Sequence, residues 1–326
     1  MTTKVRWGVL GVARIASAKV IPAMQKSELS EIAAIASRDL GKAKRAAAEL
    51  GIRKAYGSYE ELIADPEIEA IYNPLPNHLH VPWSIRAAEA GKHVLCEKPI
   101  SLTVAEAKEL VAVRDRTGVK IQEAFVPPTH PQWLGAVEVA RSGQVGPVRS
   151  IMGYFSYFND DPKNIRNMAD IGGGGALMDI GCYLIRMSRM VFAEEPRRVM
   201  ALIDTDPKLG IDRTTSLLMD YPSGQAIGTC SMQMASYQRV HIFGTKGRIE
   251  IEIPFNAPND RPCRVLVNGE AREFPVCDQY RIQGDLFSKS IRENKPNPIP
   301  LEDAVLNMRV IEAAFRSAKT GTWETP

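Results

Sequence analysis

The stretch His93-Val94-Leu95-Cys96-Glu97-Lys98-Pro99 joins a short apolar run to a glutamate, a lysine and a proline. The apolar run predicts a buried strand, and the proline blocks a helix directly after it. If this strand belongs to a parallel sheet, Lys98 lies at the carboxyl edge, where open α/β sheets bind their ligands. The stretch therefore predicts both the type of sheet and the edge that carries the chemistry.

Strand and helix patterns alternate through the first 125 residues. Strands are expected at Val5 to Leu10, Glu31 to Ser37, Ala70 to Asn73, His93 to Cys96 and Lys120 to Phe125. Asp39 is expected to cap a helix over 40–50, and Ser58 and Thr103 begin capping-box patterns. This alternation predicts a parallel sheet with helices on both faces.

The pattern changes near Pro127-Pro128, after which strands follow one another without a helix between each pair. They begin at about Val148, Arg198, Thr215, Gln225, Arg239, Arg248 and Arg264, and helices are expected at about 176–191, 280–293 and 301–319. We expect an α/β fold with a dinucleotide-binding domain over 1–125. A second domain over 126–326 is expected to carry an open, mainly antiparallel sheet and the substrate site. Because one face of such a sheet needs cover, we expect a homo-oligomer, a dimer or a tetramer.

Composition excludes several classes of protein. There are 41 Lys and Arg against 38 Asp and Glu, without a long basic run, which argues against binding to nucleic acid or to a membrane surface. The five cysteines contain no C-x-x-C pair, so neither a disulfide framework nor a zinc site is expected. No apolar stretch reaches the ~20 residues that span a bilayer, and the start does not resemble a signal peptide. A cytoplasmic enzyme without a metal is expected.

The first strand is followed by a degraded glycine-rich motif, Gly11-Val12-Ala13-Arg14-Ile15-Ala16. In a G-x-G-x-x-G motif the first glycine allows a tight turn, and the other two positions need small residues. Alanine meets that need less well, so a plain strand-to-helix turn is the alternative. The N-terminus of the next helix offers N–H groups to a pyrophosphate. We expect Gly11, Ala13, Arg14 and Ile15 to contact the nucleotide.

Ser37 and Arg38 stand at the end of the second strand, where an NAD site has an acidic residue for the ribose 2′-hydroxyl. A guanidinium can instead pair with a 2′-phosphate, so these residues favour NADP. NAD stays possible because arginine can also stack on adenine. Asp39 fits better as a helix N-cap than as a ribose ligand.

Further candidate nucleotide ligands also follow strands, as the ligand-edge rule requires. Pro76, Asn77 and His80 come after the strand that ends at Asn73, and Glu97 and Lys98 come after the next. Taken singly, His80 fits a structural or helix-capping role better than a catalytic one.

In the second half, a run of glycines at 172–175 leads into a helix that carries Asp179 and Tyr183. Four residues apart, the two side chains share a helix face. A free tyrosine has a pKa of about 10, and a lysine ammonium nearby could lower it by roughly one to three units, towards a general base. Lys98 is the candidate for that role. The alternative is structural: an acid in the first turn and a buried tyrosine.

The order of these motifs resembles the Gfo/Idh/MocA oxidoreductases across essentially the whole chain. Its most specific parts are Glu97-Lys98-Pro99 and the segment Gly173-Gly174-Gly175-Ala176-Leu177-Met178-Asp179-Ile180-Gly181-Cys182-Tyr183. The resemblance implies an N-terminal Rossmann domain, a C-terminal open-sheet domain, and hydride transfer between NAD(P) and a sugar-like alcohol or carbonyl. It implies that Lys98 is the catalytic lysine, that Asp179 orients the substrate, and that Tyr183 is the acid/base. Tyrosine there is similar to the glucose–fructose oxidoreductase, xylose dehydrogenase and dihydrodiol dehydrogenase branch.

Two features leave the substrate open. Pro127-Pro128 stand where xylose dehydrogenases often have a basic or aromatic residue, so D-xylose does not follow. Asn164 and Arg166 are candidate contacts for substrate hydroxyls, with a solvated loop arginine as the alternative. The main expectation is an NADP-dependent sugar dehydrogenase or keto-sugar reductase. A non-catalytic nucleotide-sensing or regulatory protein on the same fold is the alternative from another class.

Overall fold

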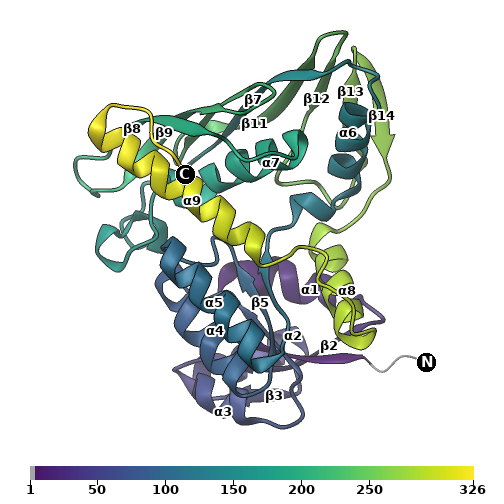
Figure 1. Ribbon diagram of the computed structural model, residues 1–326. Helices are drawn as coiled ribbons and strands as arrows, with labels where there is room; N and C mark the ends of the chain where they lie inside the picture. Colours follow the sequence, from purple (N-terminus) through teal and green to yellow (C-terminus); the bar gives the residue numbers. More distant parts are fainter. Residues whose placement is uncertain (1–3) are drawn as a thin grey trace. The chain divides into compact units, whose positions relative to one another are not determined.

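The computed structural model describes residues 4–326, apart from the side chain of Asp170, and divides into two compact units (Figure 1). The first unit runs to Val126 and also contains Asp278–Val305. The second contains Pro127–Cys277 and Leu306–Pro326. The boundary after Val126 lies one residue from the expected one, but 278–305 return to the first unit instead of staying in the second.

A six-stranded sheet forms the centre of the first unit, and all its neighbouring strands are parallel, as expected. Its order is β3-β2-β1-β4-β5-β6. The strands are β1 (Val5–Leu10), β2 (Ser30–Ala36), β3 (Lys54–Tyr56), β4 (Ala70–Asn73), β5 (His93–Glu97) and β6 (Ile121–Ala124). The order reverses direction between β1 and β4, the switch point at which open α/β sheets bind ligands.

Helices cover both faces of this sheet (Figure 1). One face packs against α3 (Tyr59–Ala64), α4 (His80–Glu89) and α5 (Val104–Thr117). The other packs against η1 (Ala16–Val20), α1 (Ile21–Met24), α2 (Leu40–Leu50) and α8 (Gln279–Arg292). On that second face the ring of Phe287 lies 5.7 Å from the ring of Trp7. The return of α8 to this unit therefore completes an apolar core.

The predicted helix caps are present. Asp39 accepts a hydrogen bond from Lys42 N–H at 3.0 Å, and Ser58 and Thr103 accept from the N–H groups of Glu61 and Glu106. The glutamates reach one residue further back than in a standard capping box: Glu61 accepts from Gly57 N–H, for example.

The second unit is built on an eight-stranded mixed sheet of order β14-β13-β12-β11-β7-β10-β9-β8. Only β7 and β10 pair in parallel, so the sheet is mainly antiparallel, as expected. The strands are β7 (Val148–Phe158), β8 (Arg198–Thr205), β9 (Asp212–Asp220), β10 (Gln225–Ser231), β11 (Gln233–Gly244), β12 (Arg248–Ile251), β13 (Cys263–Val267) and β14 (Glu270–Phe274).

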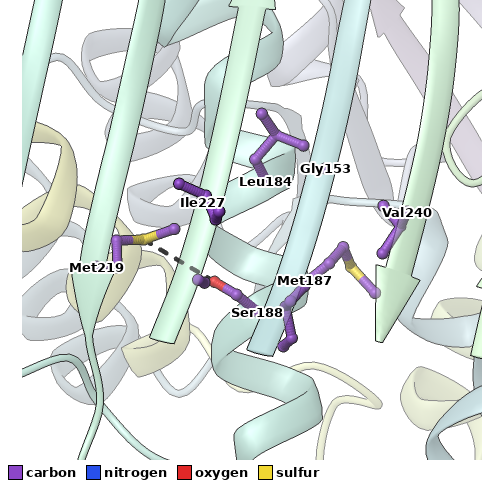
Figure 2. Close-up of a pocket in the computed structure, with 9 residues that line it drawn as sticks. Gly153, Leu184, Met187, Ser188, Met219, Ile227 and Val240 are labelled. Carbon is purple, nitrogen blue, oxygen red and sulfur yellow. Dashed lines mark hydrogen bonds between the residues drawn. The ribbon is translucent and has the colours of Figure 1, made fainter. Parts of the chain in front are cut away.

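Helices lie along one face of this sheet (Figure 1). They are α6 (Pro131–Arg141), the continuous pair η6 (Leu177–Gly181) and α7 (Cys182–Phe192), and the later part of α9 (Glu302–Thr320). Leu184 on α7 packs so closely on the sheet that a Cβ at Gly153 would lie 2.7 Å from its Cδ2. A cavity beside Gly153 and Leu184 has a volume of about 10 Å³ (Figure 2), which is too small for a ligand. Close packing against the sheet therefore fixes the position of the helix that carries Asp179 and Tyr183.

Candidate active site

The turn after β1 has the geometry that a nucleotide-binding motif needs. Gly11 has φ +79°, in the region that favours glycine, and its N–H donates to Ala36 O at 2.8 Å. A Cβ at Gly11 would lie 3.0 Å from Leu75 Cδ2. This contact places Gly11 at the switch point, beside the segment that follows β4. Arg14 is exposed in the first helical turn after it.

Arg38 supplies a positive charge at the same edge. It follows β2, whose last residue Ala36 pairs with Leu10 of β1, and its side chain is exposed. Arg38 lies near the Tyr59 hydroxyl: burial raises the pKa of Tyr59, and the guanidinium opposes this. Asp39 is occupied as a helix cap, and Ser37 Oγ accepts from Asp39 N–H at 3.2 Å. The donor set therefore fits a dinucleotide with a 2′-phosphate better than one with a free ribose hydroxyl.

The loops after β4 and β5 are tied together by His80. Its ring is buried, with Nδ1 2.9 Å from Pro99 O and Nε2 2.7 Å from Leu75 O. Burial lowers the pKa of His80 to about 4. Its ring thus holds the two loops instead of facing solvent, whereas Pro76 and Asn77 lie partly exposed at the bend after β4.

Lys98 stands in a group of polar side chains at the end of β5. Tyr72 donates its hydroxyl to Glu97 Oε1 at 2.6 Å, and the Lys98 N–H lies 3.4 Å from Glu97 Oε2. The pKa of Tyr280 is raised to about 12, mainly by burial and also by the Glu97 carboxylate, while the Lys98 ammonium opposes the shift. Lys98 is half-buried, and the peptide bond from Lys98 to Pro99 is cis.

In the second unit, both oxygens of Asp179 are engaged. Arg166 Nε donates to Oδ1 at 2.7 Å, and the Tyr157 hydroxyl donates to Oδ2 at 2.6 Å. The Asp179 side chain is only 10% exposed, whereas that of Arg166 is 40% exposed. Arg166 is therefore more than a solvated loop arginine. Asn164 caps the short turn Ile165–Asn167, which contains Arg166, and accepts from Arg166 N–H at 3.1 Å.

Tyr183 lies one turn after Asp179 on the same helix, and aromatic rings hold it in place. Its ring centre is 5.5 Å from that of Phe155 and 5.4 Å from that of Phe255, both edge to face. Phe155 and Phe255 also stack on each other at 4.7 Å. The segment η6, which carries Asp179, is π-helical, a feature frequent at functional sites.

Sequence reasoning missed three tyrosines near these residues. Tyr72 and Tyr157 lie inside strands and Tyr280 starts α8, so their spacing gave no sign of a partner. Among the described residues there is no cluster of His, Cys, Asp and Glu that could hold a metal ion. Nor is any helix of the described chain long and apolar enough to cross a membrane.

A parallel sheet with a glycine turn at its switch point, together with a second open-sheet unit, is the architecture of a dinucleotide-binding protein with a further domain. Two family models match: the oxidoreductase family with NAD-binding Rossmann fold over residues 5–125, and the GFO/IDH/MocA C-terminal domain over 133–250. The chain belongs to the Gfo/Idh/MocA oxidoreductase family.

Relatives support this membership along the whole chain. The uncharacterized oxidoreductase ORF334 of Rhizobium meliloti is 52% identical, with 98% of this chain and 99% of the relative covered. D-xylose 1-dehydrogenase (NADP(+)) 2 of Haloferax volcanii is 36% identical, with 97% and 98% covered. The crystal structure of aldose-aldose oxidoreductase from Caulobacter crescentus, complexed with glycerol, has a TM-score of 0.91 at 28% identity and covers 99% and 100% of the two chains.

Proposed function

We propose that this enzyme transfers hydride between NADP and a sugar or sugar-like hydroxyl or carbonyl compound. The observation that carries the proposal is the helix bearing Asp179 and Tyr183, where a carboxylate is held by two donors one turn before a tyrosine fixed by aromatic rings. The sugar-like class is supported by the polar group of Asp179, Arg166 and Tyr157, which suits hydroxyl groups. The similar proteins from H. volcanii and C. crescentus act on aldoses by name.

In the oxidative direction, Tyr183 Oη would remove the proton of the substrate hydroxyl. Lys98 would favour the ionised phenol and stabilise charge on the substrate oxygen. Asp179 would accept a hydrogen bond from the substrate and orient it, with Arg166 and Asn164 contributing further contacts. The nicotinamide supplies the hydride acceptor, or the donor in the reverse direction.

The nucleotide would be held along the carboxyl edge of the first sheet. Gly11, Ala13, Arg14 and Ile15 would face the pyrophosphate, and Ser37 and Arg38 the 2′-phosphate. Pro76, Asn77, Glu97 and Lys98 would line the nicotinamide half, with His80 acting through the two loops it ties. The exposed Arg38, together with the use of Asp39 as a cap, favours NADP over NAD.

The test is initial-rate absorbance at 340 nm with aldoses, polyols, dihydrodiols and keto-sugars, each with NADP and with NAD. Turnover is expected with a sugar-like compound and NADP. Lys98→Ala and Tyr183→Phe are each expected to lower kcat by about 10²- to 10⁴-fold, since each removes a group of the proton transfer. NADPH binding, followed by fluorescence, should persist in Tyr183→Phe.

The control is Lys108→Ala, which removes an exposed lysine on α5 and should keep full activity. Turnover within threefold of wild type in Lys98→Ala and Tyr183→Phe would show that other residues move the proton. Turnover of a compound without a hydroxyl or carbonyl group, with no turnover of any sugar-like compound in the panel, would overturn the substrate class.

We also propose that the chain forms a homo-oligomer through the face of the second sheet that no described helix covers. Strand register places Leu202, Ser216, Thr229, Tyr154 and Arg239 in one row across that face. Leu202 is 76% exposed, and the face has a hollow of about 340 Å³ around Tyr154 and Tyr237. Exposed apolar surface of this kind is typical of a contact between subunits.

A further inference from the structure

A buried carboxylate lies against the start of the helix that carries Asp179 and Tyr183. Asp212, the first residue of β9, is 8% exposed. Its Oδ2 accepts from Leu177 N–H at 2.7 Å and from the Thr215 hydroxyl at 2.9 Å. Leu177 opens η6, so Asp212 satisfies a backbone N–H that the first helical turn cannot satisfy itself.

The glycine run is explained by this carboxylate. Gly175 has φ +94°, and a Cβ at this position would overlap the Asp212 carboxylate. On its other side, Gly175 N–H donates to Arg166 O at 2.9 Å. A Cβ at Gly174 would lie 2.7 Å from that same oxygen. The main chain at 174–175 thus passes between the Arg166 carbonyl and the Asp212 carboxylate, where only glycine fits.

The contacts continue from there to the proposed active site. Asp179 N–H donates to Gly175 O at 3.1 Å, and the Asp179 carboxylate accepts from Arg166 Nε. A closed ring of hydrogen bonds therefore joins Gly175, Arg166 and Asp179, and Asp212 is linked to this ring through its bond to Leu177 N–H. A shift at Asp212 would move the start of the helix, and the side chains of Asp179 and Tyr183 with it.

Burial and hydrogen bonding act in opposite directions on the Asp212 carboxyl group. Burial is the larger effect and raises the pKa of Asp212 to about 6, whereas the hydrogen bonds from Leu177 N–H and the Thr215 hydroxyl favour the carboxylate. In its ionised form the group faces the positive end of the helix dipole. The buried Cys230 thiol on β10 also lies near it, and the Asp212 carboxylate adds to the effect of burial in raising the pKa of that thiol. Arg213, next in sequence, pairs away from the helix with Asp204 at 2.8 Å.

We propose that Asp212 is a positioning residue for the reaction, which anchors the start of the helix so that Asp179 and Tyr183 keep the geometry that proton transfer requires. This inference rests on the proposed function, because it assigns Asp212 through the residues that act there. Asp212 does not touch the substrate in this role. It determines where the groups that do are held.

The experiment compares Asp212→Asn with Asp220→Asn, which changes the opposite end of the same strand, where the carboxylate pairs with Arg198 at 2.9 Å. Asparagine keeps the shape of Asp212 but removes its charge and turns one acceptor oxygen into a donor, whereas Asp212 accepts from the main-chain N–H of Ala176 as well as from Leu177 and Thr215. Asp212→Asn is expected to lower kcat by about 10- to 100-fold, the effect of misplacing reacting groups, while KM for NADP stays within threefold. Asp220→Asn should keep wild-type kcat.

Amide hydrogen exchange, read by mass spectrometry, gives a second measurement that needs no turnover. In Asp212→Asn, exchange should become faster over about 174–183 and stay unchanged in the first unit. Thr215→Val, which removes one donor to Asp212 and keeps the volume, should change both measurements in the same direction by less, and it carries the test if Asp212→Asn does not fold.

Unchanged kcat with unchanged exchange over 174–183 would overturn the inference, as would faster exchange spread evenly over both units. A different pair of results would contradict the proposed function and leave this inference intact. If wild type turned over no substrate while Asp212→Asn loosened only 174–183, the anchoring would stand and the assigned reaction would fall.

Discussion

Arg38 is the residue whose replacement reports most directly on the nucleotide. Its guanidinium is exposed after β2, beside an aspartate already used as a helix cap. We expect Arg38→Ala to lower kcat/KM for NADP by about 10- to 100-fold, since a charge-assisted contact contributes about 1.5–3 kcal/mol. The rate with NAD should change by less than threefold. Paired kinetics with the two nucleotides measure this.

Arg53→Ala is the matched control, because Arg53 is an exposed arginine that pairs with Glu67 at 2.6 Å and has no proposed nucleotide contact. An equal loss with both nucleotides in Arg38→Ala would contradict the 2′-phosphate role and would favour stacking on adenine.

The sequence predicts the hydrogen-bond partners of some residues and not those of others. Asp39 could be assigned as a cap, because its acceptor role is satisfied three residues later by Lys42. Asp212 could not, because Leu177 lies 35 residues away in the sequence and the pair depends on how β9 meets η6. Tyr157 and Asp179 are likewise joined only by the tertiary fold. Local chemistry can be predicted from spacing, but contacts between distant elements cannot.

At the scale of elements, the same division applies. The apolar strands and the Gly51 helix end were predictable from pattern, and Gly51 is left-handed at φ +65°. The edge strands β3 and β14 were not predicted from the sequence. Strand β3 has only three residues, and β14 is mostly exposed and shows no apolar alternation. The helix α6 was also not predicted. It begins at Pro131, in a segment to which neither a helix nor a strand was assigned from the sequence.

The helix α8 gives an element-scale prediction. Phe287 is fully buried against Trp7 in the core of the first unit. We expect Phe287→Ala to lower the free energy of unfolding by about 3–5 kcal/mol, the cost of a large cavity. Urea unfolding measures the loss, and amide exchange should locate it in β1 and β2.

Lys289→Ala, on the exposed side of the same helix, should change stability by less than about 0.5 kcal/mol. If Phe287→Ala instead loosened β7 to β11 and left β1 protected, α8 would belong to the second unit.

At the scale of the whole molecule, the uncovered sheet face predicts the state of assembly. We expect the wild type to have at least twice the 36.0 kDa mass of one chain in light scattering. Leu202→Glu combined with Tyr237→Glu should give the mass of a single chain, because two charges on each face oppose burial.

Leu134→Glu is the control: Leu134 is 54% exposed but lies on α6, away from that face, so its variant should keep the wild-type mass. A wild type with the mass of one chain would contradict the proposed contact.

The chain's path through its two units has a practical consequence for recombination. It leaves the nucleotide-binding unit after Val126, re-enters it at Asp278 and leaves it again after Val305. A chimera made with one crossover at 126 would replace α8 with the corresponding helix of the other protein, so Trp7 would no longer pack against Phe287. To exchange the whole second unit between members of this family, the transplanted segments are 127–277 together with 306–326, which requires three junctions.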